Sequence, residues 1–114
     1  SESTARTLRG MMQEVVEGNP SHLAHVPGYR VAGKTGTSYI SVGGGYAPDI
    51  TIASFVGFVP ADDPQMIVLI KIDKPQNETL GGMVAAPVFA TLAPQILTYL
   101  GIRPDAPPMV QQGG

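Results

Sequence analysis

The residues best suited to chemistry lie together in one short segment, Lys34-Thr35-Gly36-Thr37. Alternate side chains of an extended strand face the same way, so Thr35 and Thr37 can present two hydroxyl groups to one carboxylate. Lys34 adds a fixed positive charge that also favours deprotonation of a nearby hydroxyl, and Gly36 leaves room for close approach of a ligand. A strand at the rim of a cleft can also pair with an extended peptide. The segment therefore indicates a peptide-binding strand, beside the plainer alternative of an exposed strand ending in a polar turn.

The same region also satisfies the pattern of a nucleotide-binding P-loop, since residues 28–35 read GYRVAGKT. A P-loop needs a buried strand before its first glycine and a helix directly after its lysine, because the helix N-terminus faces the phosphates. Residues 21–27 (SHLAHVP) do not read as a buried strand, and the glycines 36 and 43–45 and Pro48 follow the lysine. The surrounding sequence thus disfavours a nucleotide site. If such a site were present, the protein would bind nucleotide with magnesium.

The other candidate residues have simpler explanations. His22 and His25 are three residues apart, but their loop holds no acidic or cysteine ligand, so we expect exposed or hydrogen-bonded histidines and no metal site. Asp62-Asp63 is typical of a hairpin turn, and Asp73 follows a predicted strand as a cap or surface charge does. No cofactor is predicted. The glycines 43–45 are expected to form the tip of a mobile connector.

Two helices and three strands are predicted to position these residues. The first helix is expected to be capped by Ser3 and to end at a left-handed Gly18. Its buried stripe is expected to comprise Leu8, Met11, Met12 and Val15. The strands are predicted at residues 29–37, 50–59 and 66–72. The last helix, at 84–100, is expected to bury every fourth residue, Val88, Leu92, Ile96 and Leu100, and to kink at Pro94.

This order of elements predicts an α/β fold of the α+β type, an antiparallel sheet with packed helices. Residues 50–59 and 66–72 are apolar on both alternating faces, which implies that both faces of the sheet are covered. Two helices can hardly supply both layers, so we expect the missing layer to come from residues outside this chain. Met11, Met12 and Met83 are expected in the core, and the tail from Arg103 is predicted to be disordered.

Composition restricts the class of protein. The chain has 114 residues, enough for one domain, and its 43% hydrophobic and 14% charged residues favour a folded core. A net charge of −2 argues against a nucleic-acid partner. Because there is no cysteine, disulfides and cysteine nucleophiles are excluded. The unbroken apolar stretches fall short of the roughly 20 residues of a membrane-spanning helix.

Lys-Thr-Gly is also a sequence mark of penicillin-binding proteins and serine β-lactamases, and the chain resembles this superfamily well beyond that motif. The resemblance is carried by VAGKTGTS, ASFVGFVPADDPQMIVLIKIDKP and GGMVAAPVFATLAPQILTYLGIRPD, and it covers almost everything from Ser3 to Asp105. The FVGFVP phrase at 55–60 and the run at 82–87 are similar to class B transpeptidases rather than to β-lactamases. The resemblance implies that residues 1–105 are the C-terminal part of a serine transpeptidase domain, followed by a disordered tail at 106–114.

The resemblance also implies a mechanism. In this family a serine attacks the penultimate D-Ala carbonyl of a peptidoglycan stem peptide, expels the terminal D-Ala and passes the acyl group to a neighbouring amine. β-Lactams mimic this donor and stall as the acyl-enzyme. Lys34 is then expected to act catalytically by shaping the field around the nucleophile. Thr35 and Thr37 are expected to bind the donor carboxylate, Gly36 to give the substrate room to approach, and the main-chain N–H of Thr37 to form half of the oxyanion hole.

Two further motifs of the family, Ser-x-x-Lys and Ser-x-Asn, do not occur in this sequence. The chain alone is therefore expected to be inactive and to pair with the N-terminal remainder of the domain, on a separate chain or in a missing segment. The implied ligands are stem peptides and β-lactams, at the extracytoplasmic face of a bacterial membrane, with an upstream segment as the only membrane anchor. The alternative is a non-catalytic penicillin-recognising sensor or an inactive homologue.

Overall fold

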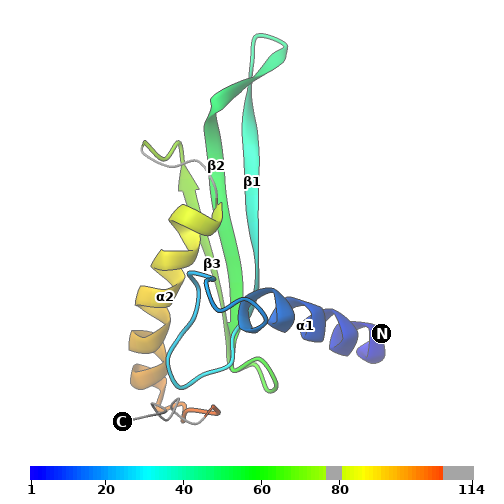
Figure 1. Ribbon diagram of the computed structural model, residues 1–114, viewed down its shortest axis with the longest axis vertical. Coiled ribbons are helices and arrows are strands. Elements are labelled where there is room, and N and C mark those ends of the chain that lie inside the picture. Colours follow the sequence, from blue (N-terminus) through cyan, green and yellow to red (C-terminus); the bar gives the residue numbers. More distant parts are fainter. Residues whose placement is uncertain (77–80, 107–114) are drawn as a thin grey trace.

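The protein combines one antiparallel sheet with two helices (Figure 1). The computed structural model describes residues 1–76 and 81–106. Its elements, in chain order, are α1 (Glu2–Glu17), β1 (Ala32–Val42), β2 (Gly45–Val59), β3 (Met66–Asp73) and α2 (Gly81–Leu100). The strand order in the sheet is β1-β2-β3, so β1 and β3 are edge strands among the described residues. The predicted α+β fold with an antiparallel sheet is confirmed.

The strands β1 and β2 run further than the sequence predicted, because both continue into a tight hairpin turn. Gly43 and Gly44 form this turn with φ of +56° and +87°, a backbone conformation that glycine adopts without steric cost. Positive φ at both central residues matches the twist of a two-residue hairpin. The predicted connector is therefore a hairpin turn, and the β1–β2 hairpin extends beyond the helices (Figure 1).

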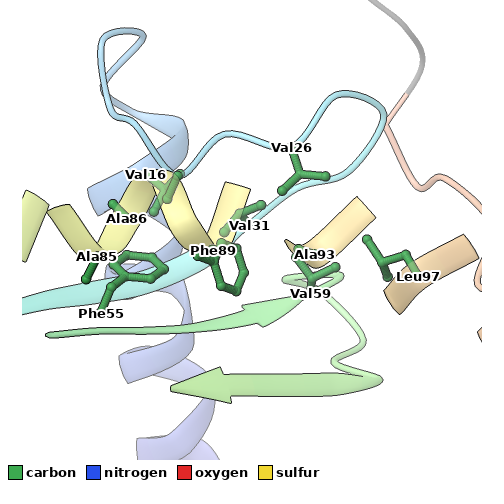
Figure 2. Close-up of a cluster of buried hydrophobic side chains, with 11 residues drawn as sticks. Val16, Val26, Val31, Phe55, Val59, Ala85, Ala86, Phe89, Ala93 and Leu97 are labelled. Carbon is green, nitrogen blue, oxygen red and sulfur yellow. The ribbon is translucent and has the colours of Figure 1, made fainter. Parts of the chain in front are cut away.

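The core lies between α2 and the odd-numbered side chains of β2 (Figure 2). Phe55 and Phe89 meet edge to face, with ring centroids 5.0 Å apart. Gly57 makes this approach possible, since a Cβ at this position would lie 2.6 Å from a ring carbon of Phe89. The buried face of α2 consists of Ala85, Ala86, Phe89, Ala93 and Leu97.

The predicted buried stripe of α2 is therefore wrong. Its members Val88, Leu92 and Leu100 are exposed, and Ile96 is only partly buried. The error is a shift of one residue, which arises because α2 is apolar around most of its circumference and its small side chains face the sheet. By length and composition α2 is apolar enough to span a membrane. Its packing on β2 and β3 is that of a core helix.

The prediction for α1 needs similar corrections. Ser1 is the N-cap, accepting the N–H of Thr4 at 3.2 Å, and Gly18 ends the helix with a right-handed φ of −76°. The only fully buried residue of α1 is Val16. Of the predicted stripe, Leu8, Met11 and Val15 are exposed and Met12 is partly buried; Met83 of α2 is exposed too. Much of α1 projects away from the sheet, so its apolar stripe has little cover within the described residues (Figure 1).

The sheet face opposite α2 carries uncovered apolar side chains. Burial alternates along β3, and Ile67 and Leu69 are 70% and 67% exposed. Their neighbours Val68 and Ile70 pack instead against the core on the α2 side. The two helices therefore leave much of one sheet face uncovered, as the two-sided apolarity of these strands predicted.

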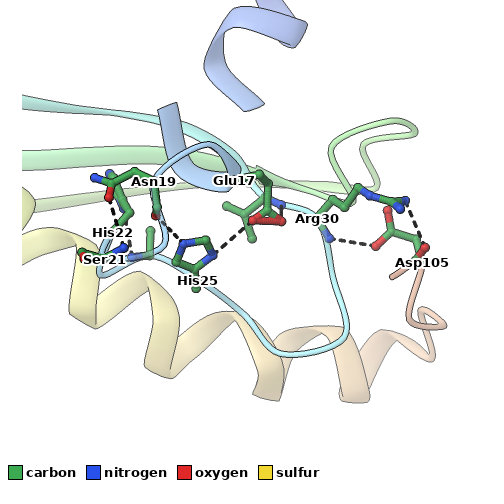
Figure 3. A network of polar contacts seen from close by, with 9 residues as sticks. Glu17, Asn19, Ser21, His22, His25, Arg30 and Asp105 are labelled. Atoms are coloured by element: carbon green, nitrogen blue, oxygen red, sulfur yellow. Dashed lines mark hydrogen bonds and ion pairs between the residues drawn. The ribbon is translucent and has the colours of Figure 1, made fainter. Parts of the chain in front are cut away.

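The segment that follows α2 returns to the start of β1. The N–H of Arg30 donates to Asp105 Oδ1 at 2.9 Å, and Arg30 Nη1 donates to the main-chain oxygen of Asp105 at 3.2 Å (Figure 3). The N–H of Ala106 donates to the oxygen of Gly28. The prediction of disorder from Arg103 is thus wrong for the residues up to Ala106, because hydrogen bonds hold them, while residues 107–114 lie outside the described residues.

Candidate functional site

The segment Lys34-Thr35-Gly36-Thr37 lies within β1, at the edge of the sheet. In register, Thr35 pairs with Phe55 and Thr37 with Ala53 of β2. The prediction of an extended strand at these residues is confirmed. A P-loop is excluded for this segment, because the strand continues to Val42 where a P-loop has a helix.

The two threonines and the lysine occupy opposite faces of β1, as the strand period predicted. Thr35 lies on the α2 side, where a Cβ added at Gly82 would be 3.7 Å from its Cγ2. The side chain of Lys34 is exposed on the other side, yet its Nζ donates to the main-chain oxygen of Thr35 at 3.0 Å. The lysine stem therefore bends back to the strand, bringing the positive charge close to the threonine segment.

The partly buried Thr35 and Thr37 line a groove of about 390 Å³. Three parts of the chain form it: β1, the loop that follows α1, and the first turn of α2. The lining residues are Asn19, Ser21, His22, Leu23, Thr35, Thr37, Gly82 and Met83. A few converging polar groups among apolar surfaces are typical of a site that orients a small ligand or the end of a peptide.

His22 is a groove residue that the sequence did not identify. The N–H of Ala24 donates to its Nδ1 at 3.1 Å, and its ring lies 5.9 Å from that of Phe55, centroid to centroid. Burial lowers the pKa of His22 from its usual 6.5, and the charges of His25 and Lys34 act in the same direction. The sequence gives no signal for this position, because only the folding of the loop brings His22 to β1.

His25 has different partners and connects the loop to the end of α1. Its Nδ1 lies 3.1 Å from Glu17 Oε2, and its Nε2 lies 2.8 Å from the main-chain oxygen of Asn19 (Figure 3). Glu17 also accepts the N–H of Val31 at 3.2 Å. Both histidines are hydrogen-bonded, which is one of the two states that the sequence predicted. No group of three or more metal-ligating His, Asp or Glu side chains gathers anywhere in residues 1–76 and 81–106.

Asp62, Asp63 and Asp73 are exposed, in agreement with the turn predicted at Asp62-Asp63 and the cap or surface charge predicted at Asp73. Asp62 and Asp63 lie in the connection between β2 and β3, where Asp62 is 3.8 Å from Arg30. Asp73 ends β3 and lies 3.5 Å from Lys71. None of these side chains lines the groove beside Thr35 and Thr37.

Comparison with known proteins places this geometry in a family. The family model of the penicillin-binding protein transpeptidase domain matches residues 1–93. The chain is 40% identical over 105 residues to stage V sporulation protein D of Bacillus subtilis, covering 91% of this chain and 16% of that protein. It is 44% identical over 104 residues to the probable peptidoglycan D,D-transpeptidase PbpC of Pseudomonas aeruginosa, covering 89% of this chain and 18% of that protein.

Solved structures agree with the sequence comparison. The transpeptidase domain of penicillin-binding protein 3 from Burkholderia pseudomallei superposes with a TM-score of 0.83 at 41% identity, covering 94% of this chain and 33% of that structure. Penicillin-binding protein 3 of Mycobacterium tuberculosis, complexed with ampicillin, gives a TM-score of 0.76 at 34% identity, covering 100% of this chain and 28% of that structure. The chain thus spans a minor part of each relative. It belongs to the penicillin-binding protein transpeptidase domain family, in its class B branch.

Proposed function

We propose that this chain supplies one wall of a peptidoglycan D,D-transpeptidase site, in which residues 34–37 of β1 bind the acyl donor. The observation that carries the proposal is the groove in which Thr35 and Thr37 lie side by side on an edge strand. The family match supports the reaction class, since relatives such as PbpC bear the name of D,D-transpeptidases. β-Lactams are proposed to occupy the same groove as mimics of the donor.

The carboxylate of the donor is proposed to bind to the hydroxyl groups of Thr35 and Thr37. Both side chains come from the same face of β1, so their hydroxyls can converge on one carboxylate. The ammonium of Lys34, held near the Thr35 carbonyl, adds a positive charge to the same site. Hydrogen bonds to a charged group are the stronger kind, about 1.5–3 kcal/mol each, so two of them give the site both affinity and orientation.

The main-chain N–H of Thr37 is proposed to form half of the oxyanion hole. In an antiparallel edge strand, alternate residues present their N–H and C=O groups to the open edge. The exposed ammonium of Lys34 contacts the Thr35 carbonyl, which supports an orientation of this carbonyl towards the open edge. Thr37 follows two residues later, so its N–H is expected to face the same edge. A preorganised donor at the developing oxyanion is worth about 2.7–4 kcal/mol of barrier.

The nucleophile is proposed to be a serine from the rest of the transpeptidase domain. Its oxygen bonds to the penultimate D-Ala carbonyl carbon, the peptide C–N bond breaks, and the serine proton passes to the leaving D-Ala amine. A neighbouring stem amine then displaces the serine oxygen, which regains a proton. The charge of Lys34 favours the deprotonated form of a nearby hydroxyl and so assists the first step.

The rest of the domain is also proposed to cover the exposed sheet face. An apolar groove of about 480 Å³ lies there between α1 and the β2–β3 side of the sheet, with Leu8, Met12, Phe58 and Ile67 in its wall. Exposed apolar surface of this kind marks an interaction site in a soluble protein. The family's substrate lies outside the cytoplasm, so the complete protein is proposed to act there, held by a membrane anchor upstream.

Labelling with a fluorescent penicillin tests this proposal. The 114-residue chain alone is expected to remain unlabelled, whereas the complete transpeptidase domain of the parent protein is expected to label covalently. Reversible binding of penicillin without a covalent product would instead identify a penicillin-recognising sensor. Covalent labelling of the chain alone would refute the proposal that its nucleophile lies elsewhere.

A further inference from the structure

We infer that His22 is a third ligand-binding residue of the groove, where its Nε2–H donates a hydrogen bond to the carboxylate of the acyl donor. The inference rests on the proposed function, because the ligand is the one that Thr35 and Thr37 are proposed to hold. The sequence marks of the family explain the threonines, but they assign nothing to His22.

His22 lies in the same groove as the two threonines. It belongs to the loop after α1, whereas the threonines belong to β1. The ring of His22 rests against Phe55, with an interplanar angle of 53°, and Phe55 is the register partner of Thr35. Because Phe55 is fully buried, it offers a fixed surface against which the imidazole is oriented.

The hydrogen bond to Nδ1 determines the tautomer of the His22 imidazole. The N–H of Ala24 donates to Nδ1 of His22, and a nitrogen that accepts a hydrogen bond carries no proton. The neutral ring therefore holds its proton on Nε2, which makes this nitrogen a donor. Within the described part of the chain, the hydrogen bond found at the His22 ring is the one at Nδ1, so Nε2 is the nitrogen left for a groove ligand.

The neutral charge state of His22 suits this role. The pKa of His22 is lowered by burial, and then by the charges of His25 and Lys34, so the ring is neutral at neutral pH. A neutral donor binds a carboxylate without placing a second full charge close to Lys34. Protonation of Nδ1 would also break the bond from Ala24, which keeps the donor role tied to one geometry.

The surrounding contacts hold the loop in place. His25 joins the loop to Glu17 at the end of α1, and Glu17 accepts the N–H of Val31 just before β1 (Figure 3). The loop that carries His22 is thus tied to both the helix and the strand that flank it. His25 does not line the groove, and in His25→Gln the side-chain amide can still donate to the main-chain oxygen of Asn19, so this variant serves as a matched control.

Two substitutions of His22 separate a binding role from a structural one. In His22→Asn the amide oxygen can replace Nδ1 as acceptor for Ala24, but no donor remains at the Nε2 position. In His22→Gln the longer amide places its NH₂ near the Nε2 position, while the acceptor for Ala24 is lost. Each variant is made in the complete transpeptidase domain, and stopped-flow acylation by benzylpenicillin gives the dissociation constant of the initial complex and the acylation rate separately.

The inference predicts that His22→Asn raises the dissociation constant about tenfold with little change in the acylation rate, since it removes a ground-state contact. His22→Gln keeps a donor near the Nε2 position and is expected to raise the dissociation constant less than His22→Asn does, whereas His25→Gln is expected to stay within about threefold of the parent domain. A normal dissociation constant in His22→Asn, with a loss in His22→Gln, would overturn the inference and assign His22 a structural role. Unaltered binding in Thr35→Val and Thr37→Val would instead overturn the proposed function, whatever the His22 variants show.

Discussion

The ammonium group of Lys34 lies 3.0 Å from the main-chain oxygen of its own neighbour, Thr35, although the two side chains leave β1 on opposite faces. A lysine is long enough to bend around a strand edge, and this contact brings its charge to the threonine segment. One strand thus delivers both the positive charge and the hydroxyl groups of the proposed carboxylate site.

Thr37→Val removes a hydroxyl group from the groove and keeps the main-chain N–H. Because a hydrogen bond to a charged group is lost, benzylpenicillin is expected to acylate the domain about tenfold more slowly at low concentration, with the covalent product unchanged. Ser38→Ala is the matched control, since Ser38 is exposed on β1 and its side chain lies on the opposite face. Equal acylation in Thr37→Val and in the control would argue against the hydroxyl as a carboxylate ligand.

Gly57→Ala is expected to destabilise the domain by about 1–3 kcal/mol, because overpacking a dense core forces side chains out of their preferred conformations. The new Cβ would lie 2.6 Å from the ring of Phe89. In Gly10→Ala the new methyl meets nothing within 4 Å, and this exposed position in α1 is expected to gain about 0.5–1 kcal/mol. Urea unfolding measures both, and a Gly57→Ala domain as stable as its parent would contradict the close approach of α2 to β2.

Asp105→Ala is expected to cost about 1–3 kcal/mol, since the partly buried N–H of Arg30 then loses its partner. Asp63→Ala, at an exposed carboxylate in the β2–β3 connection, should change the unfolding free energy by less than about 0.5 kcal/mol. Hydrogen exchange at the Arg30 amide reports on the same contact and should accelerate only in the Asp105 variant. Unchanged exchange there would show that the segment after α2 does not protect the start of β1.

Acidification is expected to weaken the fold through His22. Its pKa is lowered in the folded state, so below pH 6.5 the unfolded chain takes up a proton that the folded chain resists. The stabilisation is complete above pH 6.5 and declines as the pH falls from 6.5 towards the lowered folded-state pKa. His22→Asn should lose less unfolding free energy between about pH 8 and about pH 5 than the parent domain does. An equal loss in both would place the titrating groups elsewhere.

Much of this architecture could be predicted from local sequence. Three strands could be predicted, from the pattern of residues 34–37 and from the apolar runs at 50–59 and 66–72. A strand is recognised from the alternation and apolarity of residues that are close in the sequence. The buried face of a helix is harder to predict when most of its circumference is apolar. In α2 the ring of Phe89 faces the sheet because Gly57 leaves room for it there. That complementarity joins residues far apart in the sequence.

The site shows the same division. The shared face of Thr35 and Thr37 could be predicted, since the strand period alone places alternate side chains on one face. The place of His22 in the groove could not be predicted, because it depends on how the loop after α1 folds against β1 and against the ring of Phe55. The exposed stripe of α1 was predicted as buried, since sequence period reveals an apolar face but not what covers it.

A crystal structure of the complete transpeptidase domain acylated by benzylpenicillin is the most direct measurement. The drug carboxylate is predicted to lie within hydrogen-bonding distance of the Thr35 and Thr37 hydroxyls, with the ester carbonyl oxygen accepting the main-chain N–H of Thr37. An acylated domain whose drug carboxylate is bound away from β1, or whose ester oxygen points away from Thr37, would contradict this account.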